Sequence, residues 1–200
     1  PRTPSRTEIR LLRRIFSPNE ASLACQLRGG FETVDEIAKR LGLSVSEVSA
    51  RLSKAAERGF LWSDEQDGRP RYRLAPFVVG IYESQLGKMD VEFAQLVEKY
   101  FSDGGAAGIM KPQPALHRVI PAQGAVKTEW VLPYDDVKPL LLSAKTFNLN
   151  DCICRAQQEK LGRRCSFPIK MCFSFSSAEL PTIPNSISRD EALSILDKAE

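Results

Sequence analysis

Residues 33–47 read TVDEIAKRLGLSVSE, and this stretch decides the fold of the first part of the chain. Two Ser/Thr-x-x-Glu patterns begin at Thr33 and Ser44, and in this pattern side chains satisfy the unpaired amides at the start of a helix. Gly42 stands between them, where a left-handed residue can end the first helix. The stretch therefore predicts two short helices joined by a tight turn, the second of which ends at Gly59.

A hairpin is expected directly after the second helix. Residues 60–62 and 71–74 are apolar and aromatic enough for two short strands, with a polar tip at 64–68 between them. Two capped helices followed by such a hairpin are typical of a winged helix-turn-helix, and the whole of 31–76 resembles domains of that kind. Apolar residues at helical spacing predict two more helices in front of it, within 7–27.

We expect an α+β fold with three parts. Residues 1–88 are predicted to form the winged helix-turn-helix domain, and 89–125 a connecting helix with an extended linker. Residues 126–200 are predicted to form a small mixed α/β metal-binding domain that contains four cysteines. Within it, 135–144 indicates a helix and 146–150 a strand.

Charge and hydropathy exclude several classes of protein. The net charge is only +3, and its excess lies in residues 1–75, which hold 14 basic and 10 acidic side chains. No apolar run approaches the roughly 20 residues needed to cross a bilayer, and residues 1–7 lack the apolar centre of a secretion signal. We therefore expect a cytoplasmic protein with no membrane partner.

Seven side chains form the candidate DNA-binding set. They are Ser46, Ser49, Arg51 and Lys54 on the second helix, and Arg69, Arg71 and Arg73, which alternate along one strand of the hairpin. Acidic residues crowd the hairpin tip at 64–67, where phosphate contacts would be expected. Because this fold also serves as a protein-docking or dimerisation module, DNA and a second copy of the chain are both candidate partners.

The four clustered cysteines are the strongest chemical signal in the sequence. Cys152 and Cys154 are separated by one residue, Cys165 follows after ten more, and Cys172 after a further six. In an extended strand the first two side chains would point to the same face and could share one metal. The fifth cysteine, Cys25, lies in the second predicted helix and is expected to be a small buried hydrophobe.

The surroundings of the cysteines favour thiolates. A short helix over 155–161 would place Cys154 at a helix N-terminus, where amides and the helix dipole stabilise the anion. Five cations stand near the cysteines, against the two acids Asp151 and Glu159: Arg155, Lys160, Arg163, Arg164 and Lys170.

Three interpretations of the cysteines remain open. An iron–sulfur cluster is held by four thiolates and tolerates varied spacing. Structural zinc also takes four cysteines, but usually as two knuckles with two to four residues between ligands. Unliganded or disulfide-paired cysteines are the third interpretation.

Several motifs together resemble a family of bacterial and archaeal 4Fe-4S ferredoxin-like proteins. They are DCICR at 151–155, the Gly162-x-x-Cys165 step, Pro168, and CFSF at 172–175. The likeness continues at 76–83, through the predicted winged helix, and at 187–192, so that it covers nearly the whole chain. Members of the family continue into a further ferredoxin-type segment, which this chain lacks.

The resemblance implies a 4Fe-4S cluster held by Cys152, Cys154, Cys165 and Cys172, with zinc as the alternative. It also implies redox or electron-transfer work, for which we expect a redox partner protein or a further ferredoxin-type domain. The winged helix would then serve for docking or dimerisation. The alternative is an iron–sulfur-responsive DNA-binding regulator, and a further alternative is a zinc-stabilised interaction module. No catalytic residues are assigned, which favours an electron-transfer component over an autonomous enzyme.

Overall fold

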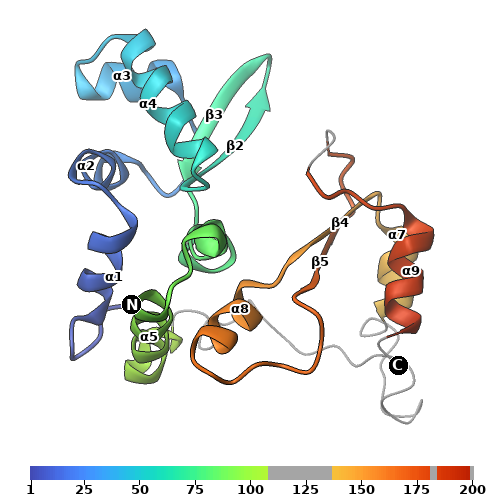
Figure 1. Cartoon of the computed structure of the whole chain (residues 1–200). Helices are drawn as coiled ribbons and strands as arrows, with labels where there is room; N and C mark the ends of the chain where they lie inside the picture. Colours follow the sequence, from blue (N-terminus) through green and yellow to red (C-terminus); the bar gives the residue numbers. More distant parts are fainter. Residues whose placement is uncertain (108–136, 181–183, 199–200) are drawn as a thin grey trace. The chain divides into compact units, whose positions relative to one another are not determined.

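The computed structural model describes residues 1–107, 137–180 and 184–198, in which helices and strands are mixed along the chain (Figure 1). This mixture agrees with the expected α+β class. The chain divides into two compact units, Pro1–Ile109 with Ala156–Arg164, and Met110–Arg155 with Cys165–Glu200. Every helix in the described ranges is too short or too polar to cross a lipid bilayer.

Two short helices open the first unit. Helix α1 (Thr7–Ile15) buries Leu11 and Ile15 and packs against α5 (Val91–Tyr100). Helix α2 (Pro18–Gln26) begins with a complete capping box, and its proline stands at the position where a missing amide proton costs least. Because α2 buries only Leu23, Cys25 is exposed, and the prediction of a buried Cys25 is wrong.

The two helices predicted from residues 33–47 are present. Helix α3 (Val34–Leu41) starts with the expected capping box at Thr33, and Gly42 ends it with a φ of 66°. Helix α4 (Val45–Glu57) is capped by the side chain of Ser44, which accepts a hydrogen bond from the backbone N–H of Glu47.

The hairpin is longer than predicted. Strands β2 (Leu61–Gln66) and β3 (Arg69–Leu74) stay paired up to the two-residue turn Asp67-Gly68, so the predicted tip at 64–68 is wrong. Both turn residues have positive φ, 53° and 72°, as the common two-residue hairpin turn requires. A two-residue strand, β1 (Glu32–Thr33), pairs with β3 and completes a sheet of order β1-β3-β2.

The rest of the first unit packs through aromatic rings. Two short segments, η1 (Phe77–Ile81) and η2 (Glu83–Lys88), lead from the hairpin to α5, whose N-cap is Asp90. The segment η3 (Phe101–Gly105) follows α5. The rings of Phe77, Tyr82, Tyr100 and Phe101 lie with centroids 5.6–6.4 Å apart. Such tilted and edge-on contacts add to the apolar burial of the rings.

The second unit is built on a two-stranded antiparallel sheet, β4 (Thr146–Asp151) with β5 (Lys170–Ser176). Helices α7 (Val137–Ser143) and α9 (Arg189–Asp197) contact each other, and the core joins Leu141, Ala144, Phe147 and Ala192. The predicted helix at 135–144 and strand at 146–150 are present within the described residues. The linker predicted up to residue 125 lies outside the described residues from residue 108 onwards.

Candidate functional site

All four clustered cysteines lie in the second unit, on the chain that leaves β4 and returns in β5. Cys152 follows β4 directly, Cys154 is the second residue of helix α8 (Ile153–Lys160), and Cys165 lies in the loop after α8. Cys172 lies within β5, where it pairs with Asn150 of β4. The two strands therefore form the stem of a closed loop that carries all four thiols.

The stem is closed at its cysteine end. The backbone N–H of Cys152 donates a hydrogen bond of 2.8 Å to the carbonyl of Ile169. Between this bond and the Asn150–Cys172 pair the register shifts, and Met171 is the extra residue of a β-bulge. Bulges re-aim side chains and are frequent next to functional sites, and this one lies directly beside Cys172.

Cys154 lies in the first turn of α8, which begins two residues earlier than the predicted helix. The interpretation of Cys152 and Cys154 as neighbours on one extended strand is therefore wrong, because the chain becomes helical at Ile153. The helix ends as predicted near Gly162, whose φ is 74°. Cys154 is exposed, and its place in the first turn sets it among the unpaired amides that favour a thiolate.

The cations near the cysteines have different roles. Arg155 donates a hydrogen bond to the carbonyl of Pro168 and lies over the ring of Phe167, which ties the start of α8 to the loop before β5. Arg163 pairs with Glu98 at 2.6 Å, and Arg164 with Glu159 at 3.5 Å. Part of the predicted positive surplus is therefore neutralised by carboxylates.

The four thiols do not form a complete metal-binding site in this structure. Across residues 1–107, 137–180 and 184–198, no three His, Cys, Asp or Glu side chains come close enough together to hold an ion. Four thiols suit a 4Fe-4S cluster or zinc chemically, but the described arrangement does not fit either as it stands.

The predicted DNA-facing residues of α4 lie mostly on its open side. Ser46, Arg51 and Lys54 are exposed, and Ser49 is half-buried. Arg51 donates a hydrogen bond of 2.6 Å to Glu47, one turn earlier on the same helix. Lys54 lines a pocket of about 310 Å³ together with Arg51 and residues at the start of α2.

Two of the three hairpin arginines are held by neighbours within the domain. Arg71 forms a two-point ion pair with Asp64 at 2.9 and 2.6 Å, and this raises the pKa of the guanidinium. Arg73 lies between two rings, 4.8 Å from the centroid of Phe31 and 4.5 Å from that of Trp62. Arg69 is exposed beside the turn. On this face of the sheet, Arg71 is therefore paired with a carboxylate and Arg73 is stacked on aromatic rings, so neither is a free cation for binding phosphate.

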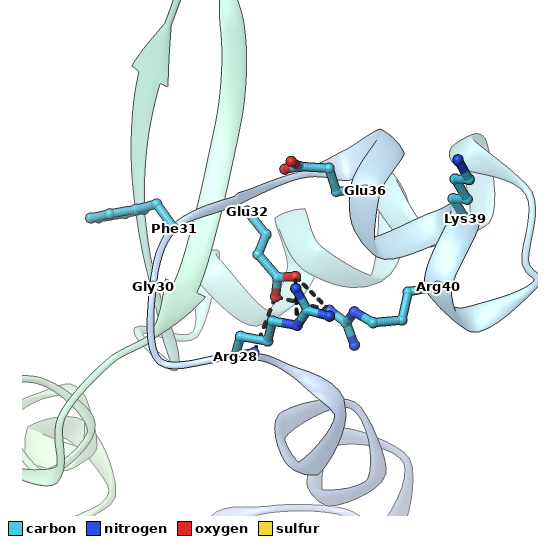
Figure 2. A pocket seen from close by; sticks show the side chains of 7 residues that line it. All are labelled: Arg28, Gly30, Phe31, Glu32, Glu36, Lys39 and Arg40. Carbon is cyan, nitrogen blue, oxygen red and sulfur yellow. Dashed lines mark hydrogen bonds and ion pairs between the residues drawn. The ribbon is translucent and has the colours of Figure 1, made fainter.

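A second pocket, which the sequence did not predict, lies between the end of α2 and α3 (Figure 2). It has a volume of about 650 Å³ and surrounds the buried carboxylate of Glu32. Glu32 accepts hydrogen bonds from Arg40 and from the backbone N–H of Arg28. A lone Glu ahead of a helix gives no sequence signal for such a pair.

Comparison of the chain with models of known protein families and with curated proteins found no match.

Proposed function

We propose that Cys152, Cys154, Cys165 and Cys172 hold one 4Fe-4S cluster, and that the protein has a redox or electron-transfer role. The placement of all four thiols on one loop, closed at its base by the β4–β5 ladder, carries this proposal. The Cys152 to Ile169 hydrogen bond keeps the first and last parts of the loop together before any metal binds. Closing the loop on a metal then costs less chain entropy than in a free peptide.

The donor set and its surroundings favour a cluster over zinc. The ligands come from a strand end, a helix start, a loop and a bulged strand, and this irregular set lacks the paired knuckles of structural zinc sites. A tetrathiolate centre is anionic, and Lys160 and Lys170, both exposed and near the loop, would offset part of that charge. Zinc remains the alternative, and with it the function of a zinc-stabilised interaction module.

Metal content tests the proposal directly. We expect anaerobic reconstitution of the full chain with ferrous iron and sulfide to give about four irons per chain and a broad visible absorption. Replacing Cys152, Cys154, Cys165 or Cys172 with Ser should each lower the iron content. Cys25→Ser is the matched control, because Cys25 lies in the first unit, and it should keep full loading. One zinc per chain with no iron uptake would support the zinc module, and full loading of Cys152→Ser would end the proposal.

Binding of the cluster should also change the conformation of the loop between α8 and β5. Because the described thiols are not yet gathered, reconstitution should slow proteolysis and amide exchange between residues 161 and 169. Helices α7 and α9 should show much smaller changes, because they already pack in an apolar core. Equal exchange in the loop with and without metal would contradict a centre built by these four residues.

We infer further that residues 31–76 form a winged helix used for docking a redox partner or a second copy of the chain. The order α3, α4, β2, β3, with β1 added to the sheet, supports this assignment. The internal pairing of Arg51 and Arg71 favours a docking role, since these cations already have carboxylate partners. Chemical cross-linking of the loaded protein, compared with the metal-free chain, would detect self-association through this domain.

A cluster-responsive DNA regulator is the second candidate function. The exposure of Ser46, Arg51 and Lys54 on one side of α4 favours it, because a recognition helix needs an open polar face. This function predicts duplex binding that depends on Arg51 and differs between loaded and metal-free protein. Absence of any such difference would leave the redox role as the function of the cysteine loop.

A further inference from the structure

Helix α1 and the chain in front of it carry an excess of positive charge. Residues 1–16 contain five arginines and a single acidic residue, Glu8. Glu8 is already held by Thr3, whose hydroxyl donates to it at 2.6 Å and whose backbone N–H donates at 3.1 Å. The carboxylate is thus held by hydrogen bonds at the start of the chain.

The arginines of α1 differ in whether they have partners. Arg14 pairs with Asp90 and Glu92 at the start of α5. Arg6, Arg10 and Arg13 are all exposed, and none of them has a carboxylate partner among the residues that the structure describes. In this they differ from Arg51 and Arg71 of the predicted DNA-facing set, which are paired with acids.

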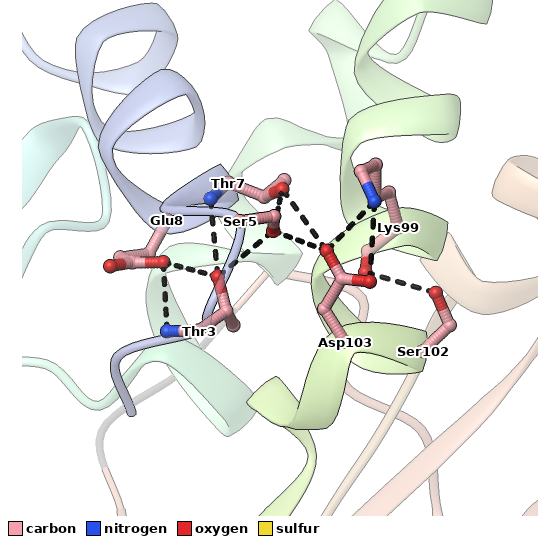
Figure 3. A network of polar contacts seen from close by, with 7 residues as sticks. All are labelled: Thr3, Ser5, Thr7, Glu8, Lys99, Ser102 and Asp103. Carbon is pink, nitrogen blue, oxygen red and sulfur yellow. Dashed lines mark hydrogen bonds and ion pairs between the residues drawn. The ribbon is translucent and has the colours of Figure 1, made fainter.

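The unpaired arginines point away from the core. Leu11 and Ile15 bury one face of α1. At 100° per residue Arg13 lies opposite this face, and Arg10 lies about 120° around the helix from it. Arg6, the N-cap, is flanked in the sequence by Ser5 and Thr7. Both of these side chains contact Asp103 of η3, just after α5 (Figure 3). Asp103 is also held by Lys99 at 2.9 Å, so the start of α1 is fixed by a polar network and Arg6 is presented from a rigid position.

We propose that Arg6, Arg10 and Arg13, here called the α1 arginine face, bind the sugar–phosphate backbone of a duplex nucleic acid. Guanidinium groups match phosphate oxygens in a two-point geometry, and these three have no carboxylate to displace first. The contact is to the backbone only, so it positions the protein without reading sequence. The proposal does not rest on the metal centre.

Other occupants suit this face less well. A second copy of α1 would set arginine against arginine, and an isologous contact here would be repulsive. A lipid surface needs a broad apolar face, but the apolar face of α1 is buried against the domain, and only Ile9 and Leu12 remain partly exposed, at 43% and 44%. Ile9 and Leu12 are neighbours on the helix surface, but two apolar side chains make only a small apolar spot, which is ordinary in soluble domains.

The test compares two triple variants of the full chain. Arg6→Gly/Arg10→Gln/Arg13→Gln removes the α1 arginine face with little strain, because Arg6 has a φ of 54°, which glycine adopts freely, and glutamine is a good helix former. Arg51→Gln/Lys54→Gln/Arg69→Gln removes the same charge from α4 and the hairpin. Binding to a fluorescent DNA duplex of mixed sequence is then measured by anisotropy over a series of salt concentrations.

We expect the unmodified chain to bind at low salt and the α1 variant to bind at least about tenfold more weakly, with a log K–log salt slope smaller by about 2 to 3. The α4 variant should keep most of the affinity and slope. An RNA duplex in place of DNA should give a similar slope, because both present phosphates. Unchanged thermal unfolding of both variants would show that the loss of affinity comes from the missing arginine–phosphate contacts and not from unfolding.

Three results would overturn the proposal. One is no duplex binding even at low salt, and another is loss of binding in the α4 variant alone, which would place the contact on α4 and the hairpin. The third is tight binding to vesicles of phosphatidylserine and phosphatidylcholine, lost in the α1 variant, with no binding to either duplex. That result would assign the face to an anionic lipid surface instead.

Discussion

Both oxygens of the Glu32 carboxylate accept hydrogen bonds from Nη2 of Arg40, at 2.9 and 2.8 Å, across the space between β1 and the end of α3. Only 9% of the Glu32 side chain is exposed, against 26% of Arg40. The backbone N–H of Arg28 adds a third bond at 3.1 Å. The pair therefore fixes the two-residue strand β1 to the helix that follows it. The buried charge of Glu32 is balanced by an arginine that is itself partly exposed to solvent.

Removing the arginine should be more damaging than removing both charges. In Arg40→Leu the Glu32 carboxylate stays buried without its main partner, and we expect a loss of about 2–3 kcal/mol in the free energy of unfolding. In the double variant Glu32→Leu/Arg40→Leu no charge is left buried, and the loss should be smaller than in Arg40→Leu. Urea unfolding of the two variants measures this difference, and a double variant less stable than Arg40→Leu would contradict it.

Gly59 follows the end of α4, at a position where both the backbone conformation and a neighbouring residue exclude a side chain. Its φ of 73° is unfavourable for other residues, and a Cβ built there would overlap the side chain of Ser84. We expect Gly59→Ala to destabilise the protein by about 2–3 kcal/mol, from backbone strain together with the overlap. Gly42→Ala is the matched control, since Gly42 has a φ of 66° but open space around it, and it should cost only about 1 kcal/mol. Equal losses in thermal unfolding would show that Ser84 imposes no constraint.

Local rules predicted the helices of this protein well. The caps at Thr33 and Ser44 form as their spacing predicts, because each depends on side chains within three residues of the helix start. Ser17, Asp90 and Ser188 cap their helices by the same local contact. The strands were harder. β1 is only two residues long, and the hairpin extends past its predicted tip because polar residues pair there as readily as apolar ones.

Parts of the cysteine loop could not be predicted from the sequence. The spacing of the cysteines identified the candidate ligands, but not that Ile153 begins a helix between the first two of them. Strand β5 could have been predicted, because Met171, Phe173 and Phe175 alternate with smaller residues. The bulge and the Cys152–Ile169 bond depend on pairing across about twenty residues, which no local pattern encodes.

The capping box of α3 should make stability depend on pH. The backbone N–H and then the hydroxyl of Thr33 donate to Glu36, and both bonds lower the pKa of that carboxyl. A lowered folded-state pKa stabilises the fold above the ordinary value for glutamate, about 4.3, and this stabilisation is lost as the pH falls through the lowered pKa. We therefore expect the melting temperature to drop between about pH 5 and about pH 3.

Glu36→Gln separates this effect from general acid unfolding. Glutamine accepts the same hydrogen bonds from Thr33 but does not titrate over this range. The variant should therefore lose less of its melting temperature on acidification than the unmodified protein, although it starts from a slightly lower value. Glu191, which caps α9 through Ser188 in the same way, provides an independent repeat in the second unit. Parallel melting curves for Glu36→Gln and the unmodified chain would rule out a titrating cap.

Gln157 is a buried polar residue of α8, in the segment Ala156–Arg164 that belongs to the first unit. The hydroxyl of Tyr82 donates to its side-chain oxygen, and its amide nitrogen lies 3.4 Å from the carbonyl of Ala94. Only 4% of Gln157 and 1% of Tyr82 are exposed. Gln157→Leu leaves the buried hydroxyl without this acceptor, and we expect a loss of about 1–3 kcal/mol, with faster amide exchange in the second half of α8. Adding Tyr82→Phe removes the hydroxyl that has lost this acceptor, so the double variant should be less destabilised than the sum of the single variants. Strict additivity would show that the hydrogen bond contributes nothing.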